Sequence, residues 1–277
     1  LTEDDVTWRQ YTFGNFSSAR TIYFESINAE YIEAETFLIN QFTSDGINSY
    51  PEIVLSTGDD GRLRVYHNDE GDFSTNDYVS LAEGLAPTDV FALDMDSNGS
   101  QDIATLSESG RVAWYQNQDS EFGVRQDISV PSLRYSRSAF ADLDGDGNEE
   151  IVGITNSSRL EIRENLGIGA FEEEAIEFYN VYRYGFLELI DLDTDGDLDV
   201  LLTDQSQVNW FQNQGALSFD SEEAILVLPS DIRDMEYVDM DNDNDVDIVI
   251  SLVNGDVSWY ENDGTGTFNN QFPIQSD

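Results

Sequence analysis

The sequence contains no cysteine and no lysine, and it contains a single histidine, His67. The absence of cysteine excludes disulfide bonds and thiolate metal sites. No apolar run approaches the roughly 18 residues of a membrane-spanning helix, so we expect no membrane span. His67 stands at a slot filled elsewhere by Gln116, Glu164, Gln212 and Glu261, and it is interpreted as a surface residue. No Ser-His-Asp or Cys-His set can be assembled around it. We therefore expect no catalytic residues and no enzymatic activity.

Positive charge is also scarce. The 277 residues include 57 acids and only 12 bases, all of them arginine, and the formal net charge is −45. Such a field repels nucleic acid and anionic lipid and attracts cations. A hydrophobic content of 39% with 12% aromatic residues favours a packed core over disorder. The charge is typical of a salty or calcium-rich exterior, so we expect an extracellular, secreted or cell-surface protein.

The segment 191–199 places five aspartates on alternate positions and holds Gly196 at position 6. Ca²⁺ prefers about six to eight oxygen ligands at about 2.3–2.6 Å, which oxygens at positions 1, 3, 5, 7 and 9 of a tight loop can supply. Position 7 of such loops usually contributes its backbone carbonyl. Gly196 can turn the chain through positive φ without a Cβ clash. The alternative, a solvated run of charge, explains neither the alternation nor the repetition described next.

Three more segments repeat this pattern, at 94–102, 142–150 and 239–247, and successive copies begin 48, 49 and 48 residues apart. We expect about four Ca²⁺ ions, one in each acidic loop. The predicted ligands are Asp94, Asp96, Asn98, Ser100 and Asp102; Asp142, Asp144, Asp146, Asn148 and Glu150; Asp191, Asp193, Asp195, Asp197 and Asp199; and Asp239, Asp241, Asp243, Asp245 and Asp247.

An EF-hand loop is the first alternative, since it also uses oxygens at positions 1, 3 and 5 with Gly at 6. It needs a bidentate Glu at position 12 and a helix on each side. Here position 9 is the last acid, and short apolar, β-branched runs follow at once. Those runs, 103–106, 151–154, 200–202 and 248–250, are typical of buried strands.

Each repeat contains four predicted strands in about 48 residues: one entering the loop, one leaving it, a third that ends in asparagine, and a fourth opened by phenylalanine. The third strands are 112–117, 160–165, 208–213 and 257–262, and the phenylalanines are Phe122, Phe171, Phe219 and Phe268. Four-stranded units at this period are the signature of an all-β β-propeller. The length favours six blades, with five or seven as alternatives, and almost no helix.

A degenerate copy precedes the four acidic repeats. Residues 63–68 and 52–55 match the third and second strands, but the loop at 41–52 has lost most acids, and we expect no metal there. We predict one propeller domain over 1–277. Its parts are a partial, closing blade at 1–36, a degenerate repeat at 37–85, and calcium-loop repeats at 86–133, 134–182, 183–230 and 231–277.

These residues resemble the FG-GAP and VCBS repeat family, the calcium-loop propellers that include the integrin α-subunit head. The family loop reads D-x-D-x-D-G-x-x-D, and segments 142–150 and 191–199 match it closely apart from Glu150. Asn98 replaces the third ligand in one copy, and Asn244 replaces glycine in another. The resemblance covers roughly residues 37 to 277. It implies the fold and a metal held between the first two strands of each blade, and it implies little about function.

Trp114, Trp210 and Trp259 occupy the same point of the repeat. They could form a sugar-stacking ladder or pack between blades, and we favour packing. Pairs of carboxylates could serve glycoside hydrolysis, but among 57 acids the proximity of two carries almost no information.

The sequence therefore predicts a non-catalytic, calcium-stabilised extracellular propeller that acts as a binding or adhesion module. Its partner would be an extracellular protein or polysaccharide, and the domain could belong to a larger surface protein or filament. The alternatives are a calcium-dependent, carbohydrate-binding lectin and an accessory domain of a secreted polysaccharide-degrading enzyme.

Overall fold

The computed structural model describes residues 6–8, 11–12, 15–16, 20–22, 34–40, 52–57, 62–67, 78–82, 87–118, 121–128, 134–179 and 185–275. In these ranges every regular element is a β-strand. The described residues contain no helix that is long and apolar enough to cross a membrane. The chain divides into two compact units, residues 1–129 and 130–277.

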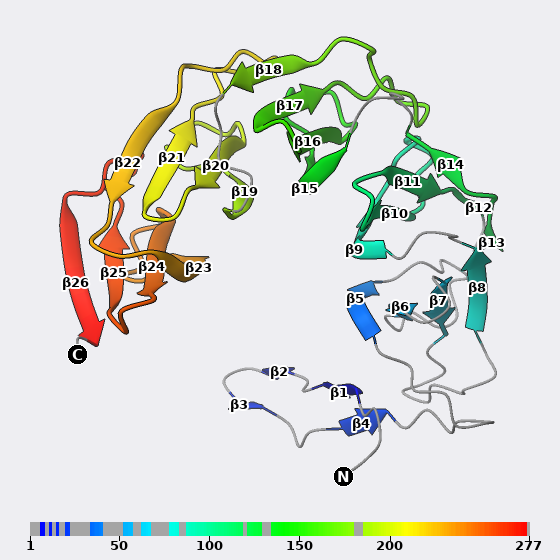
Figure 1. Cartoon of the computed structure of the whole chain (residues 1–277), viewed down its shortest axis with the longest axis horizontal. Helices are drawn as coiled ribbons and strands as arrows, with labels where there is room; N and C mark the ends of the chain where they lie inside the picture. Colours follow the sequence, from blue (N-terminus) through cyan, green and yellow to red (C-terminus); the bar gives the residue numbers. More distant parts are fainter. Residues whose placement is uncertain are drawn as a thin grey trace. The chain divides into compact units, whose positions relative to one another are not determined.

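The second unit consists of three four-stranded antiparallel sheets in chain order (Figure 1). In every sheet each strand pairs with the next along the chain, which is the meander expected for a propeller blade. The strands are β15 (Tyr135–Ala141), β16 (Glu150–Thr155), β17 (Arg159–Arg163) and β18 (Ile176–Tyr179); β19 (Leu187–Ile190), β20 (Asp199–Thr203), β21 (Gln207–Phe211) and β22 (Glu223–Val227); and β23 (Ile232–Val238), β24 (Asp247–Leu252), β25 (Val257–Glu261) and β26 (Asn270–Gln275).

The first unit contains two sheets of the same design. The degenerate repeat forms β5 (Ala34–Asn40), β6 (Glu52–Thr57), β7 (Arg62–Tyr66) and β8 (Tyr78–Ala82). The first acidic repeat forms β9 (Pro87–Leu93), β10 (Asp102–Ser107), β11 (Val112–Tyr115) and β14 (Gln126–Asp127). Two-stranded sheets pair β1 (Val6–Trp8) with β4 (Arg20–Ile22), β2 (Tyr11–Thr12) with β3 (Asn15–Phe16), and β12 (Asn117–Gln118) with β13 (Glu121–Phe122).

Residues 1–36 thus supply short strands, as predicted, but their role in closing a ring stays a prediction. The loop at 41–51 lies outside the described residues. The prediction of one six-bladed domain over 1–277 also stays a prediction.

The second strand of each acidic repeat is the centre of its sheet. Every residue of β10, β16 and β20 is buried, because both faces of these strands are covered. Their near-continuous apolar sequence, rather than an alternating one, is typical of strands buried on both sides. Side chains of neighbouring sheets meet in shared clusters: Leu143, Ile154 and Phe211 join the first two sheets of the second unit. Leu201, Trp210 and Ile250 join the last two.

Trp210 packs in the cluster shared by two sheets, as favoured from the sequence, and Trp114 is buried. Trp114 is 2% exposed and Trp210 is 7% exposed, so neither ring can stack on a sugar. Trp259 differs: it is only partly buried and stacks on Phe272, with ring centroids 4.4 Å apart.

The prediction that a phenylalanine opens the fourth strand was wrong. Phe122, Phe171 and Phe219 instead bridge back to the asparagine that ends the third strand, and the fourth strand begins several residues later. The reason is that the asparagine and the phenylalanine pair with each other across a short loop. The alternating sequence pattern does not distinguish this pairing from a continuing strand.

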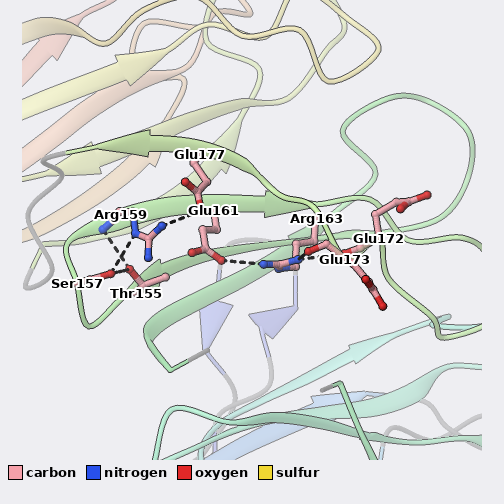
Figure 2. Close-up of polar contacts among 8 residues, drawn as sticks. All are labelled: Thr155, Ser157, Arg159, Glu161, Arg163, Glu172, Glu173 and Glu177. Atoms are coloured by element: carbon pink, nitrogen blue, oxygen red, sulfur yellow. Dashed lines mark hydrogen bonds and ion pairs between the residues drawn. The ribbon is translucent and has the colours of Figure 1, made fainter. Parts of the chain in front are cut away.

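One repeat carries a polar pair where the others carry an aromatic ring (Figure 2). Arg163 occupies the slot of a Tyr or Phe in the other acidic repeats, and its Nη2 lies 3.2 Å from Glu161 Oε2. Its Nη1 donates to the carbonyl oxygens of Glu172, at 3.0 Å, and Glu173, at 2.6 Å. Arg163 and Glu161 are 5% and 1% exposed. These two hydrogen bonds of Arg163 join the third strand to the connection that precedes β18.

Candidate metal centres

Each acidic loop brings three carboxylates together. One oxygen from each member of a triad lies within 4.8 Å of the others. Positions 1 and 3 take part in every loop, joined by position 5 in two loops and by position 9 in the other two. The triads are Asp94, Asp96 and Asp102; Asp142, Asp144 and Asp146; Asp191, Asp193 and Asp195; and Asp239, Asp241 and Asp247.

The carboxylate at position 1 shapes the loop by accepting backbone N–H groups. Asp191 Oδ1 accepts from Asp195 N and Asp191 Oδ2 from Gly196 N, each at 3.1 Å. Asp195 Oδ1 in turn accepts from Asp197 N at 3.0 Å. The other three loops repeat these bonds, with position 1 accepting from the amides of positions 5 and 6 and position 5 accepting from position 7.

Two positions of each loop are left-handed. Position 6 has positive φ, as predicted for Gly196, where φ is 99°. Asn244, which replaces glycine there, has φ 79°, and asparagine is among the residues that tolerate this region. Position 4 is also left-handed, for example at Thr194 with φ 60°. That second turn had no signal in the sequence, because residues of four different types occupy position 4.

The last acid of each loop is fully buried and anchors the loop to its sheet. Asp199 Oδ2 accepts from Leu192 N at 3.1 Å, and Asp199 Oδ1 accepts from Asn213 N at 2.7 Å. Asp102, Glu150 and Asp247 make the equivalent pair of bonds and are likewise 0% exposed. Glu150, which departs from the family pattern, keeps both bonds because its longer side chain still reaches them.

Sequence reasoning missed two groups of residues that organise these loops. The asparagine that ends each third strand is 0–1% exposed and meets the last acid, as described for Asn213. A glutamine just before it reaches position 3: Gln116 Nε2 donates to Asp96 Oδ2, and Gln212 Nε2 donates to Asp193 Oδ2. The recurring asparagine was visible in the sequence, but its contact with a residue 14 or 15 positions away was not.

The donor set fits a hard cation. Asp193 shows this best, since its Oδ2 accepts from Gln212 while its Oδ1 is buried and receives no hydrogen bond. A buried carboxylate oxygen without a partner costs free energy, which a cation in the triad would offset. Carboxylate oxygens are the ligands that Ca²⁺ and Mg²⁺ prefer. The four clusters could therefore bind metal ions.

The side chains at position 7 lie outside all four triads. A Cβ added at Gly215 would lie 3.1 Å from Asp197 Oδ2, and one at Gly264 would lie 2.5 Å from Asp245 Oδ2. These carboxylates thus face the connection between the third and fourth strands. This placement agrees with a position that offers its backbone carbonyl rather than its side chain.

Burial raises the pKa of several loop carboxyls in the metal-free chain. The pKa of Asp102 and of Glu150 rises to about 7 and that of Asp199 to about 6, chiefly by desolvation, although donation from backbone N–H groups lowers each of them. Desolvation also raises the pKa of Asp144 and Asp193. The neighbouring carboxylates add to all five shifts.

A pH dependence follows from the sign of these shifts. Between about pH 4 and pH 7 the folded metal-free protein binds more protons than the unfolded chain, so its stability falls as the pH rises through this window. We expect the metal-free protein to unfold at a higher temperature at pH 5 than at pH 8. We expect the gain in melting temperature on adding Ca²⁺ to be larger at pH 8, because protons compete for the same oxygens. Calorimetric scans at both pH values, with and without Ca²⁺, measure this; equal metal-free stabilities would contradict it.

His67 was predicted to be a surface residue, and the structure places it at the surface with a partly covered side chain. It is 28% exposed, and its Nδ1 lies 2.5 Å from Glu52 Oε1, while Glu52 is 2% exposed. Glu52 occupies the place of the last acid in the degenerate repeat, and His67 occupies the slot of Gln116 and Gln212. The single histidine therefore contacts a buried acid of a repeat whose loop has lost most of its carboxylates.

His67→Ala should lower the free energy of unfolding of the first unit by about 1–3 kcal/mol, because it removes a partner from a buried carboxylate. Urea denaturation measures this. His67→Gln restores a donor at the same slot and should recover part of the loss. Gln116→Ala is the matched change in an acidic repeat, and in the presence of Ca²⁺ it should lower the free energy of unfolding by less than His67→Ala does. Equal losses for the two variants would contradict the stabilising role of the His67–Glu52 contact.

One protein-family model matches parts of this chain. A model of the FG-GAP-like repeat matches residues 94–153 and 191–250, and each match contains two of the acidic loops. These two regions are FG-GAP-like repeats. A search of curated proteins finds no match to the chain.

Solved structures similar to this chain include propeller proteins. An Agrocybe aegerita lectin, described as recognising non-reducing terminal N-acetylglucosamine, has a TM-score of 0.69 at 18% identity, over 100% of this chain and 81% of the lectin. The structure of BBS1N in complex with ARL6DN has a TM-score of 0.58 at 12% identity, over 98% of this chain and 76% of the matched chain. The Photorhabdus luminescens Tc holotoxin pore has a TM-score of 0.52 at 16% identity, over 97% of this chain and 13% of its own. At these identities the chain shares the fold alone.

Proposed function

We propose that the protein is a non-catalytic, calcium-stabilised β-propeller that acts as an extracellular binding or adhesion module. The observation that carries this proposal is the set of four carboxylate triads at equivalent positions of FG-GAP-like repeats. A bound Ca²⁺ would neutralise the carboxylates of its loop. The predicted ligands at positions 1, 3, 5 and 9 would hold the ion, together with the backbone carbonyl at position 7.

The chain's own residues explain why such ions would be structural. In each loop the oxygens of position 1 already hold the turn, and the last acid already joins the loop to the second and third strands. A cation that stabilises the ionised acids thus stabilises these backbone contacts as well. Among the residues that the structure describes, the two buried carboxylates outside the acidic loops, Glu52 and Glu161, each have a basic partner, which supports a structural rather than a catalytic role for them.

Two features support an extracellular setting. Loops of this kind fill where free Ca²⁺ is plentiful, since extracellular modules work at about 10⁻⁴–10⁻³ M. A net charge of −45 without lysine also suits an ion-rich exterior, where counterions screen self-repulsion. The module would present its connecting loops to a protein or polysaccharide partner, alone or as part of a larger surface protein.

A calcium-dependent lectin is the second candidate. One observation favours it: Phe272 is 42% exposed and stacks on the partly buried Trp259, so the last sheet offers an aromatic surface of the kind on which sugars stack. The similarity in fold to a lectin is compatible with this candidate.

Two measurements test these proposals. Isothermal titration with Ca²⁺ and Mg²⁺ should show about four sites that prefer Ca²⁺, and the absence of any divalent binding would end the first proposal. A glycan array with the calcium-loaded protein should then separate the candidates. Selective binding that is lost in Phe272→Ala, with the melting temperature unchanged, supports the lectin, whereas no glycan binding favours a protein partner.

A further inference from the structure

The acidic loops of the second unit are connected to one another by buried asparagines. Asn213, two residues beyond β21, the third strand of its repeat, donates its backbone N–H to Asp199 Oδ1 at 2.7 Å. Its side-chain Nδ2 donates to the carbonyl oxygen of Leu143 at 2.7 Å, and Leu143 is position 2 of the preceding acidic loop. The backbone N–H of Leu143 donates to Glu150, the last acid of that loop, at 2.8 Å.

The next pair of loops repeats this connection. Asn262 donates its backbone N–H to Asp247 Oδ1 at 2.8 Å and its Nδ2 to the carbonyl oxygen of Leu192 at 2.7 Å. The N–H of Leu192 donates to Asp199 Oδ2 at 3.1 Å. A continuous chain of hydrogen bonds therefore passes through Glu150, Leu143, Asn213, Asp199, Leu192, Asn262 and Asp247 and ends at Met240 N.

This chain is rigid because it is buried and because its polar groups have defined partners. Asn213, Asn262, Asp199 and Asp247 are 0% exposed. The Nδ2 of Asn213 also donates to the Leu198 carbonyl, at 3.1 Å, and its Oδ1 accepts from Gly215 N, at 3.1 Å. A buried polar group that loses its partner carries the full cost of desolvation, so a shift of one last acid disturbs the next loop.

We infer that Asn213 and Asn262 are positioning residues that couple cation binding in the three acidic loops of the second unit. This inference rests on the proposed function. A cation in loop 191–199 holds the carboxylates of that loop, including Asp199 through the loop backbone. Asp199 accepts the hydrogen bond that positions Asn213. Asn213 in turn binds the Leu143 carbonyl and so keeps the backbone of loop 142–150 in the arrangement that brings the three carboxylates of that loop together. Filling one loop therefore raises the affinity of its neighbour, and linkage makes the effect mutual.

A thermodynamic cycle tests the coupling. Hydrogen exchange, followed by mass spectrometry on peptides covering 142–150 as Ca²⁺ is titrated, reports the affinity of that loop. Asp195→Ala, which disables loop 191–199, should weaken Ca²⁺ binding at 142–150 by about fivefold or more, the lower end of typical couplings. In the Asn213→Ala background, adding Asp195→Ala should change the affinity of 142–150 no further. A purely structural asparagine would leave the effect of Asp195→Ala intact in both backgrounds.

Asn254→Ala is the matched control and should leave the coupling unchanged. The side chain of Asn254 is exposed and forms hydrogen bonds with Asp256 in its own turn. If Asn213→Ala does not fold, Asp195→Ala and Asp243→Ala still decide the matter, since each leaves both asparagines in place and should weaken the loop before it. Loops that bind Ca²⁺ independently in these variants would overturn the inference while leaving the proposed function standing. If Ca²⁺ protects none of the loops, the proposed function itself fails.

Discussion

Removing Ca²⁺ with EGTA is expected to lower the melting temperature of the protein by more than about ten degrees at low ionic strength. Each filled site stabilises the folded state by about 2.7 kcal/mol when free Ca²⁺ is at 100 times the dissociation constant. For domains of 150–250 residues, 1 kcal/mol shifts the melting temperature by about 2–4 °C. Four triads thus predict a large shift. Differential scanning calorimetry with matched Ca²⁺ and EGTA samples measures it.

The charge of the protein supplies the control for this experiment. Chelation leaves the clustered carboxylates to repel one another, and like charges close together at a protein surface repel by about a kcal/mol or more per pair. Molar NaCl should therefore restore part of the lost melting temperature in EGTA by screening this repulsion. A melting curve that EGTA does not change would remove calcium from the account of this fold.

Asp195→Ala is expected to remove one bound ion and to destabilise its sheet by a few kcal/mol, about the scale of losing a metal or unpairing buried charge. Asp195 belongs to the triad of loop 191–199, and its Oδ1 also accepts from Asp197 N. Native mass spectrometry should count four ions on the wild type and three on the variant. Gly196 remains free to turn, so within loop 191–199 the loss should come only from ligation and the contacts of this side chain.

Two further variants check the ion count. Asp220→Ala changes an exposed acid of the same repeat, whose side chain accepts a hydrogen bond from Gln214 Nε2 outside the acidic loop, and it should leave four ions and an unchanged melting temperature. Asp45→Ala alters the degenerate loop and should also leave four ions. Five ions on the wild type, with one lost in Asp45→Ala, would show that the stretch 41–52 binds metal after all.

The strands and the acidic loops could be predicted from the sequence because their signals are local. Alternating aspartates followed at once by residues such as Ile151 or Val200 mark a loop that leads into a buried strand. The period of about 48 residues then aligns four such units, and the structure confirms four-stranded antiparallel sheets at each of them. Gly196 was predicted to be left-handed for the same local reason, since only the backbone of its own turn decides it.

What the sequence did not reveal depends on residues distant in the chain. His67 and Glu52 are 15 residues apart, so their contact had no signal in the alternation of the strand. Phe171 pairs with Asn165 instead of opening a strand, because a bridge across a short loop looks like a continuing strand in a one-dimensional pattern. The left-handed Thr194 also escaped notice, since a threonine there has no obvious preference for positive φ.

The sequence by itself thus determined the repeat, the strands and the carboxylates that could gather around a cation, because spacing along one chain segment is enough to place them. Only the tertiary structure decided what each acid does. Asp199 anchors backbone amides on two sides, and Asn213 reaches a carbonyl 70 residues earlier, because stacking of successive sheets brings these segments together. Burial there leaves no water to take the place of a lost partner, and that is why these contacts can connect one loop to the next.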